Sequence, residues 1–151
     1  MCNLLFIGAA VVFLFFRKFR QGGAAMCGAI LLSLLVGNLL LKNLVARDRP
    51  CWIDPDFLQL LVSVPKDFSF PSAHTMISVS AAAALFHYSK ALGIPALVIA
   101  ALVGFSRLYL FVHFPTDVLG GALIGAVIAY LVCAVYRRKT GQKGSIWNFE
   151  R

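Results

Sequence analysis

Three short polar clusters interrupt an otherwise apolar chain and contain the residue types that could do chemistry. They run from Lys42 to Pro50, from Pro71 to His74 and from Ser106 to Asp117, at the ends of long hydrophobic runs. Charged side chains in such places are energetically unfavourable and usually functional, so the clusters are candidate parts of one site. The candidate residues are Lys42, Arg49, Ser72, Ala73, His74, Arg107, His113 and Asp117.

The cationic residues of these clusters suit a phosphate ligand. Lys42, Arg49 and Arg107 offer up to three positive charges, and two of them are guanidinium groups, whose planar donors match tetrahedral oxyanions. Ser72, at the expected start of a helix, adds a hydroxyl and free backbone N–H groups, which bind anions. The pattern predicts a phosphate-binding site.

Two histidines supply the groups needed to break a phosphate ester. One can attack phosphorus as a neutral imidazole, and the other, when protonated, can give a proton to the leaving oxygen. The nucleophile needs a fixed tautomer, which a carboxylate on its other ring nitrogen supplies. Asp117 lies four residues after His113, with Pro115 between them. We therefore expect His113 to be the nucleophile, Asp117 its partner and His74 the acid.

The composition of the 151-residue chain indicates a membrane protein with a single domain. Hydrophobic residues make up 60% of the chain, charged residues make up only 13%, and the mean hydropathy is +0.85. Because the apolar residues form long blocks, the expected fold is all-α, a polytopic bundle of membrane helices. The formal charge of +8 comes from residues between these blocks and at the tail, where Lys and Arg act as topology signals. Nucleic-acid binding is therefore not expected.

The four cysteines indicate neither a metal site nor a disulfide framework. Cys2, Cys27, Cys51 and Cys133 lack the paired short spacing that is typical of zinc sites. Three of them lie in or beside apolar runs, where buried thiols are expected. No metal or other cofactor is predicted, and no feature of the sequence specifies an oligomeric state.

About five transmembrane helices account for the apolar runs, which are residues 2–16, 24–41, 72–88, 96–112 and 116–136. Turns are expected at 21–23 and 89–95. The long connection 42–70 is expected to lie along the membrane, with a short surface helix at 57–64. Gly121 and Gly125 form a GxxxG pair, which favours close contact between helices.

Alternate connections fall on opposite sides of the membrane, and their charges differ. One side receives most of the basic residues against a single acid, whereas acids and bases balance on the other. The positive-inside rule makes the first side cytoplasmic and places all three clusters on the outer face of the cell (inner) membrane. We expect a membrane-embedded domain at 1–136 and a basic cytoplasmic tail at 137–151, which can also contact anionic lipid of the bilayer.

Each candidate residue also has an ordinary structural interpretation. Lys42 alone could be a snorkelling anchor, Arg107 a stop signal, and a single histidine an interface residue. Their joint occurrence on one membrane face favours a site instead. Several polar residues are left outside this site: His87 at the cytoplasmic end, Arg47 and Asp48 as a loop ion pair, Lys66 and Asp67 as a solvated pair, and Asn38 as a contact between helices.

The three clusters together resemble the signature of the type 2 phosphatidic acid phosphatase (PAP2) superfamily. The matching elements are Lys42, six residues and Arg49-Pro50; Pro71-Ser72-Ala73-His74; and Ser106-Arg107, five residues, His113, three residues and Asp117. The resemblance covers about residues 24–136, and the flanking residues 67–70 and 118–121 are also similar to bacterial members.

This resemblance implies a metal-independent helical phosphatase that works through a phosphohistidine. It implies that Lys42, Arg49, Ser72 and Arg107 hold the phosphate. The chain departs from the family at Ala73, where glycine is usual; in the first turn of a helix alanine is acceptable, and its N–H remains available. We also expect that the chain lacks one N-terminal helix of the usual six, because its first apolar run is short and starts outside the membrane.

The predicted function is hydrolysis of a lipid phosphate or diphosphate monoester at the outer membrane surface. Undecaprenyl diphosphate is the first expected substrate, followed by phosphatidylglycerophosphate or phosphatidic acid. The alternative from another class is a non-catalytic lipid-binding or transport protein that retains the phosphate pocket. A vanadate-dependent haloperoxidase shares the signature, but a small multispan chain argues against it.

Overall fold

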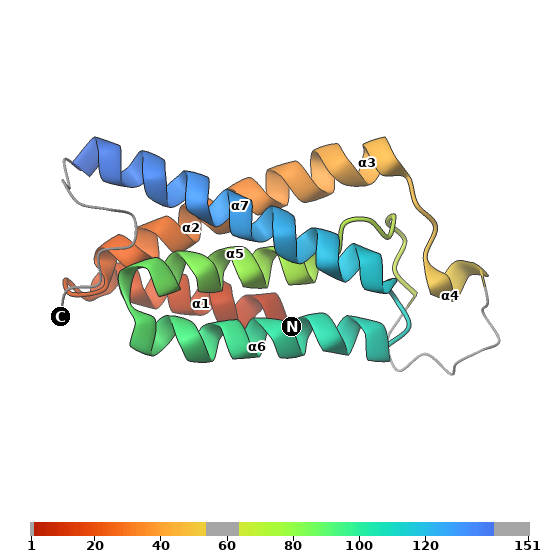
Figure 1. The fold of residues 1–151 in the computed structure, drawn as a ribbon, viewed down its shortest axis with the longest axis horizontal. Coiled ribbons are helices and arrows are strands. Elements are labelled where there is room, and N and C mark those ends of the chain that lie inside the picture. The colour runs from red at the N-terminus through yellow and green to blue at the C-terminus, as the bar shows by residue number, and fades with distance from the viewer. Residues whose placement is uncertain (1, 54–63, 141–151) are drawn as a thin grey trace.

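The computed structural model describes residues 2–53 and 64–140 and is entirely helical over these residues (Figure 1). The elements in chain order are α1 (Cys2–Phe15), α2 (Arg20–Leu34), the π-helix η1 (Leu35–Leu41), α3 (Lys42–Val45), α4 (Pro50–Ile53), α5 (Ala73–Tyr88), α6 (Lys90–Tyr109) and α7 (Pro115–Thr140). The surface helix predicted at 57–64 lies, but for Val64, outside the described residues. The predicted all-α fold is confirmed.

α2, η1 and α3 follow one another without a break and form one long helix from Arg20 to Val45. Its end is set by Ala46, which has the left-handed conformation (φ 46°). That conformation is unfavourable for alanine by roughly 1–2 kcal/mol, and it turns the chain back across the end of the bundle. The turn directs Arg47 and Arg49 toward the other polar clusters.

α5 is the central helix, in contact with α1, α2, α6 and α7 (Figure 1). Small side chains, including Ser80, Ala81 and Ala84, are buried along it and let the neighbouring helices approach closely. At Gly125 of α7 an added Cβ would lie 2.5 Å from the Met76 carbonyl oxygen of α5. The close contact predicted from the GxxxG pair is therefore confirmed.

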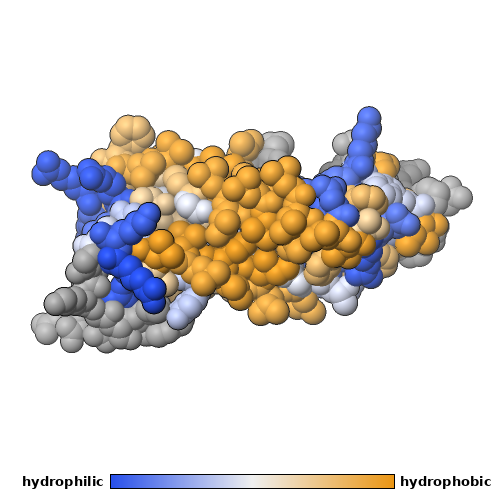
Figure 2. Space-filling model, turned by 90° about the horizontal axis from the view of Figure 1, so that it is seen from above, coloured by the Kyte–Doolittle hydropathy of each residue, from blue (hydrophilic) through white to orange (hydrophobic). Residues whose placement is uncertain are grey.

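The outer surface of the bundle is that of a multi-pass membrane protein. Three helical stretches are long and apolar enough to cross a membrane, namely Arg20–Ile53, α6 and α7, while α1 and α5 are shorter. Exposed leucine, valine and phenylalanine side chains form an apolar band between two hydrophilic ends (Figure 2). Lipid is the solvent that suits such a band, because large apolar patches are rare on surfaces facing water.

The turn predicted at 21–23 is wrong, and the turn predicted at 89–95 is confined to Ser89; glycine is the reason for both differences. The residues 21–23 lie inside α2, and at Gly23 an added Cβ would lie 2.9 Å from the Ala10 oxygen of α1. The chain turns at Ser89, but residues 90–95, with Pro95 among them, lie inside α6, and at Gly93 an added Cβ would meet the Phe86 backbone. These glycines permit close helix packing instead of marking turns.

Other boundaries differ less. α7 continues to Thr140, beyond the predicted domain boundary at 136, and the rest of the tail lies outside the described residues. Cys51 and Cys133 are buried thiols as expected, whereas Cys27 is only half-buried.

Candidate active site

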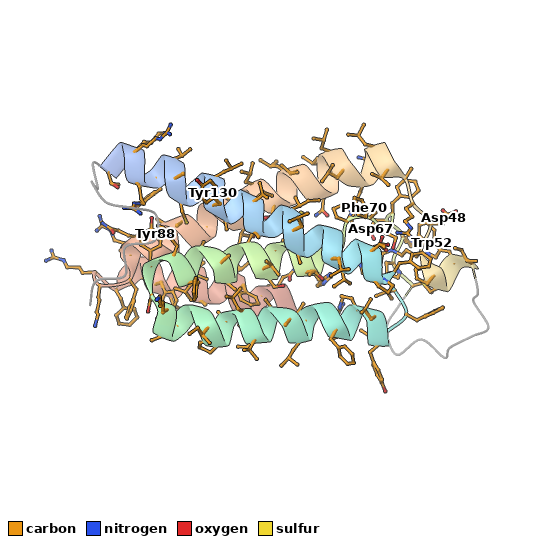
Figure 3. All side chains as sticks on the ribbon, viewed as in Figure 1. Asp48, Trp52, Asp67, Phe70, Tyr88 and Tyr130 are labelled. Atoms are coloured by element: carbon orange, nitrogen blue, oxygen red, sulfur yellow. The ribbon has the colours of Figure 1, made fainter. Side chains whose placement is uncertain are left out.

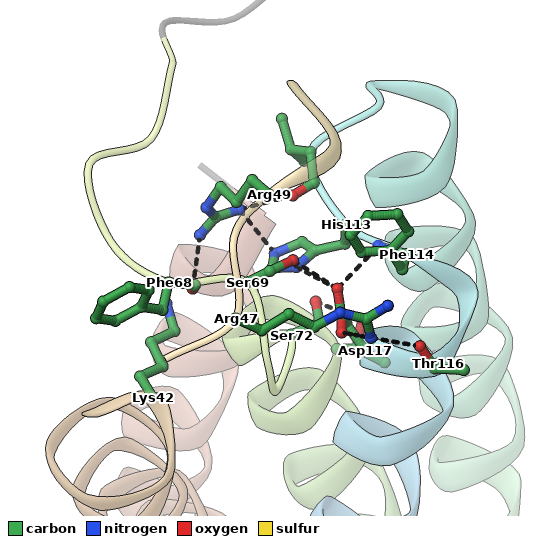
Figure 4. A network of polar contacts seen from close by, with 12 residues as sticks. Lys42, Arg47, Arg49, Phe68, Ser69, Ser72, His113, Phe114, Thr116 and Asp117 are labelled. Carbon is green, nitrogen blue, oxygen red and sulfur yellow. Dashed lines mark hydrogen bonds and ion pairs between the residues drawn. The ribbon is translucent and has the colours of Figure 1, made fainter. Parts of the chain in front are cut away.

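The three polar clusters meet at one end of the bundle, where α3 ends, α5 begins and α6 connects to α7 (Figure 1). Lys42, Arg49, His113 and Asp117 are brought together with Ser69 and Arg47 in one network of polar contacts (Figure 4). His74 and Arg107 lie in the adjoining turns of α5 and α6. The structure therefore brings together residues that are distant in the sequence.

The position of the proton on His113 follows from its neighbours. Arg49 Nη1 lies 3.2 Å from Nε2 of the ring. Because a guanidinium can only donate, Nε2 must be the accepting nitrogen, and the neutral ring carries its proton on Nδ1. Nδ1 lies 3.3 Å from the hydroxyl oxygen of Ser69. The lone pair of Nε2 thus faces the guanidinium of Arg49.

Asp117 contacts His113 mainly through Ser69. The distance from Asp117 Oδ2 to His113 Nδ1 is 3.8 Å, which is too long for a hydrogen bond. The Ser69 hydroxyl instead donates to Asp117 Oδ2 at 2.5 Å and is left to accept the Nδ1 proton of His113. The expected pair of histidine and carboxylate is present, but a serine that the prediction omitted lies between them.

The carboxylate of Asp117 is fully buried and fully engaged. It accepts hydrogen bonds from the Phe114 N–H at 2.8 Å and from Arg47 Nη1 at 2.8 Å. Arg47 also donates to Thr116 Oγ1 at 2.6 Å and lies over the Phe114 ring. The predicted loop ion pair of Arg47 with Asp48 is therefore wrong. Arg47 belongs to the site, where it neutralises the buried carboxylate.

His113 is neutral at physiological pH. Burial and then the positive charge of Arg49 lower the pKa of His113 to about 3, against the opposing effect of Asp117. A neutral imidazole with an unprotonated Nε2 is the form that can attack phosphorus.

Lys42 and Arg49 are held by Asp67, which the sequence placed in a solvated pair with Lys66. Lys42 Nζ contacts Asp67 Oδ2, and Arg49 Nη2 lies 2.8 Å from Asp67 Oδ1. Burial alone would raise the pKa of Asp67, but the hydrogen bonds and charges of Lys42 and Arg49 lower it below its ordinary value. The solvated-pair prediction is wrong, because the carboxylate forms a bridge between two cations.

The start of α5 is open to an anion. The first hydrogen bond of this helix runs from Met76 N to Ser72 O at 2.9 Å, so the N–H groups of residues 73–75 precede it. No side chain of residues 2–53 or 64–140 caps them. The N–H of Ser72 itself is not free as predicted, because it donates to the Asp117 carbonyl oxygen at 3.1 Å. Ala73 is helical with a negative φ, so its methyl group adds no backbone strain.

Arg107 is the cation that remains available. Its Nε and Nη2 donate to Ser106 Oγ at 3.2 and 3.1 Å, and no carboxylate of the described residues pairs with it. The charges of Arg107, Lys42 and Arg49 all act on the His74 ring. We refer to Lys42, Arg49, Arg107 and the N-terminus of α5 as the anion site. Over the described ranges, no group of His, Cys, Asp and Glu side chains could hold a metal ion.

Comparison with known proteins gives the family. A model of the PAP2 superfamily matches residues 22–141. The chain belongs to the PAP2 superfamily. An undecaprenyl-diphosphatase of Sulfolobus acidocaldarius is 32% identical over 129 residues, which are 84% of this chain and 61% of that protein. Phosphatidylglycerophosphatase B of Bacillus subtilis is 36% identical over 143 residues, 85% of this chain and 64% of that protein. The chain thus spans about three-fifths of the length of these curated PAP2 relatives.

Solved structures agree with this assignment. The transmembrane PAP2-type phosphatidylglycerolphosphate phosphatase of Bacillus subtilis has a TM-score of 0.68 and 34% identity, covering 93% of this chain and 70% of that one. The structure of Aquifex aeolicus LpxE has a TM-score of 0.70 and 29% sequence identity, and the match covers 87% of this chain and 83% of that one. The PAP2 fold, as a bundle of membrane helices, is therefore shown for this chain.

The site predicted from the sequence did not include three residues of the network: Ser69, Arg47 and Asp67. Ser69 and Asp67 lie in the flanking segment 67–70, which resembles bacterial members and could have drawn attention to them. Arg47 had no such signal, because its contact with Asp117 depends on the turn at Ala46.

Proposed function

We propose that this PAP2 protein is a membrane lipid phosphatase that hydrolyses a phosphate or diphosphate monoester through a phosphohistidine at His113. The observation that carries the proposal is the neutral Nε2 of His113, which faces Arg49 at 3.2 Å beside an uncapped helix N-terminus. Undecaprenyl diphosphate is the first expected substrate, which the name of the archaeal relative supports. Phosphatidylglycerophosphate is the second, supported by the two Bacillus proteins.

In the first step the anion site binds the phosphoryl oxygens, and Arg49 Nη1 moves from Nε2 to one of them. Nε2 then attacks phosphorus while the bond to the leaving oxygen breaks and His74 gives that oxygen a proton. The positive charge that develops on the His113 ring is stabilised by Asp117 through the Ser69 hydroxyl. One proton is transferred in this step, from His74 to the leaving oxygen of the released lipid.

In the second step a water molecule attacks the phosphohistidine. His74, now neutral, takes a proton from the water, the bond between Nε2 and phosphorus breaks, and inorganic phosphate leaves. Both histidines return to their starting protonation states. Apart from the substrate, the two steps use side chains of the protein and one water molecule.

The proposed orientation places the active site on the extracytoplasmic face. The basic residues of the opposite end of the bundle support it, because Lys and Arg are enriched on the cytoplasmic side. They are Arg17, Lys18, Arg20, Lys90, Arg137, Arg138 and Lys139. These residues belong to the connection from α1 to α2, the start of α6 and the end of α7, which lie at the opposite end of the bundle from the connection between α6 and α7 (Figure 1).

A panel of lipid phosphates tests the function. Purified protein in mixed micelles is given undecaprenyl diphosphate, phosphatidylglycerophosphate or phosphatidic acid, with and without EDTA, and phosphate release is measured. We expect release that is insensitive to EDTA and fastest with undecaprenyl diphosphate. No release from any of these lipids, together with retained binding of a phosphate analogue such as tungstate, would favour the non-catalytic alternative.

The pH dependence of kcat/KM should show a rising limb far below neutrality. The pKa of His113 lies at about 3 instead of its ordinary 6.5, so the nucleophile stays neutral as the pH falls from about 7 to about 5. His74 must be protonated in the complex, where the negative charge of the bound phosphate favours the cationic ring, so the falling limb is read from kcat and not from kcat/KM. A rising limb near pH 6.5 that does not move when the substrate is changed would contradict the burial and charge assigned to His113.

Substitution of Ser69 by alanine should lower kcat by roughly ten- to a hundredfold with little change in KM, because His113 loses the acceptor that fixes its tautomer. Ser69→Thr retains the hydroxyl and should recover most of the rate. The measurement is steady-state phosphate release by both variants. Equal kcat for wild type and Ser69→Ala would show that Asp117 orients His113 without the serine.

A further inference from the structure

The carboxylate of Asp67 occupies part of the anion site. Its two oxygens each serve one cation, Oδ2 contacting Lys42 and Oδ1 lying 2.8 Å from Arg49 Nη2. Two non-bridging oxygens of a phosphate would make the same pair of contacts. Lys42 and Arg49 have buried side chains, with relative exposures of 6% and 3%, whereas the side chain of Asp67 is 56% exposed. Asp67 therefore covers the two cations from the solvent side.

The carboxylate can leave without disturbing the main chain beneath it. Arg49 Nε donates to the Asp67 carbonyl oxygen at 2.7 Å, and Arg49 Nη2 donates to the Phe68 carbonyl oxygen at 3.3 Å. The Ser69 N–H donates to the Arg47 carbonyl oxygen at 2.8 Å. None of these contacts involves the Asp67 carboxylate, so they would still hold the segment in place if the side chain turned away from its cations. Asp67 lies at the end of the bundle, near Asp48 and Trp52 (Figure 3).

We propose that Asp67 is a specificity-determining residue that excludes phosphodiester headgroups and admits terminal phosphates. The inference rests on the proposed function. A phosphodiester has one negative charge and two free oxygens, so it only replaces what the carboxylate already supplies, and the displaced carboxylate repels it. A terminal phosphate has a charge of about −1.5 to −2 and three free oxygens, so it gains contacts that the carboxylate does not make.

Those additional contacts are available in the site. Arg107 has no carboxylate partner among the described residues, and the N–H groups at the start of α5 have no capping side chain. A third phosphoryl oxygen can use both. At a membrane surface the selectivity matters, because phosphodiester lipids are in large excess over any lipid with a terminal phosphate. Without Asp67, the cations Lys42 and Arg49 would be open to binding by these abundant phosphodiester headgroups.

The first test uses turnover. Wild type, Asp67→Asn and the control Asp48→Asn are assayed in mixed micelles. Asp48 is an exposed acid between α3 and α4 that has no ion pair among the described residues. The surface fraction of phosphatidylmethanol, a monoanionic phosphodiester that is not a reaction product, is raised at the expense of neutral diacylglycerol. We expect the apparent KM of Asp67→Asn to rise about tenfold, while wild type and Asp48→Asn change little. Equal sensitivity of all three proteins would overturn the proposal.

The second test needs no turnover, so it separates this inference from the proposed function. Binding of inorganic phosphate and of dimethyl phosphate is measured by calorimetry. Wild type should bind phosphate and discriminate strongly against dimethyl phosphate, and Asp67→Asn should bind dimethyl phosphate about tenfold more tightly than wild type does. Loss of phosphate binding by Asp67→Asn would show that Asp67 anchors the cations instead, and would overturn the inference. Selective binding without phosphate release from any lipid would refute the proposed function alone.

Discussion

Replacement of His113 by alanine is expected to lower kcat by at least about four orders of magnitude, because the attacking nitrogen is removed while the anion site remains. Arg49 would retain its bonds to Asp67 and to the Val112 carbonyl oxygen at 2.9 Å, so the site should stay assembled. Steady-state phosphate release measures the loss, and a thermal melt in detergent establishes that the variant is folded.

The matched control for this variant is His87→Ala. His87 lies near the opposite end of α5 and takes no part in the network, so its replacement should leave phosphate release unchanged. A His113→Ala protein that keeps more than about a hundredth of the wild-type rate would mean that another group attacks phosphorus.

Replacement of His74 by alanine should lower kcat by about 10²–10⁴-fold, the usual contribution of a positioned acid. The loss should depend on the substrate. The leaving group of a lipid diphosphate is itself a phosphate and needs little protonation, whereas a lipid monophosphate must release an alkoxide unless His74 protonates it. The expected loss is therefore larger for the monophosphate.

This second prediction is measured with a diphosphate and a monophosphate that share one hydrocarbon chain. The comparison removes differences in how the tail binds. An equal loss with both substrates would assign His74 to phosphate binding instead of proton transfer.

Much of the site could be predicted because its location depends only on the number of membrane crossings. With alternating helices, the segments around Lys42, Ser72 and Arg107 had to reach the same face, and the structure places them at one end of the bundle (Figure 1). The family signature then gave the residue types. Helix bounds near the site were predicted well for the same reason, since Ser72 and Pro115 mark the starts of α5 and α7.

The contacts within the site could not be predicted from spacing. His113 lies in the connection before α7, after a residue with positive φ at Phe111, so its separation of four residues from Asp117 does not have helical geometry. The imidazole and the carboxylate are consequently 3.8 Å apart, and the Ser69 hydroxyl lies beside them and contacts both. The partners of Asp67 and Arg47 were likewise set by the path of the chain after Ala46, which no local pattern shows.

The helix boundaries at the opposite end of the bundle were predicted less well, because glycine was interpreted as a turn residue. A Gly-Gly pair after a basic cluster is typical of a turn in soluble proteins. In a membrane bundle the same residue permits close packing, as the 2.9 Å between an added Gly23 Cβ and the Ala10 oxygen shows. Whether a glycine marks a turn or a close helix contact depends on which helix packs against it, and the sequence does not specify that helix.

The most direct test of the phosphohistidine at His113 is to trap it. Wild type and His113→Ala are mixed with undecaprenyl diphosphate labelled with ³²P in the terminal phosphate, quenched in alkali within a single turnover, and examined for label bound to protein. We expect alkali-stable, acid-labile label on wild type that maps to His113 and is absent from the variant. Equal labelling of both proteins, or phosphate release by wild type without any labelled protein at the shortest times, would contradict it.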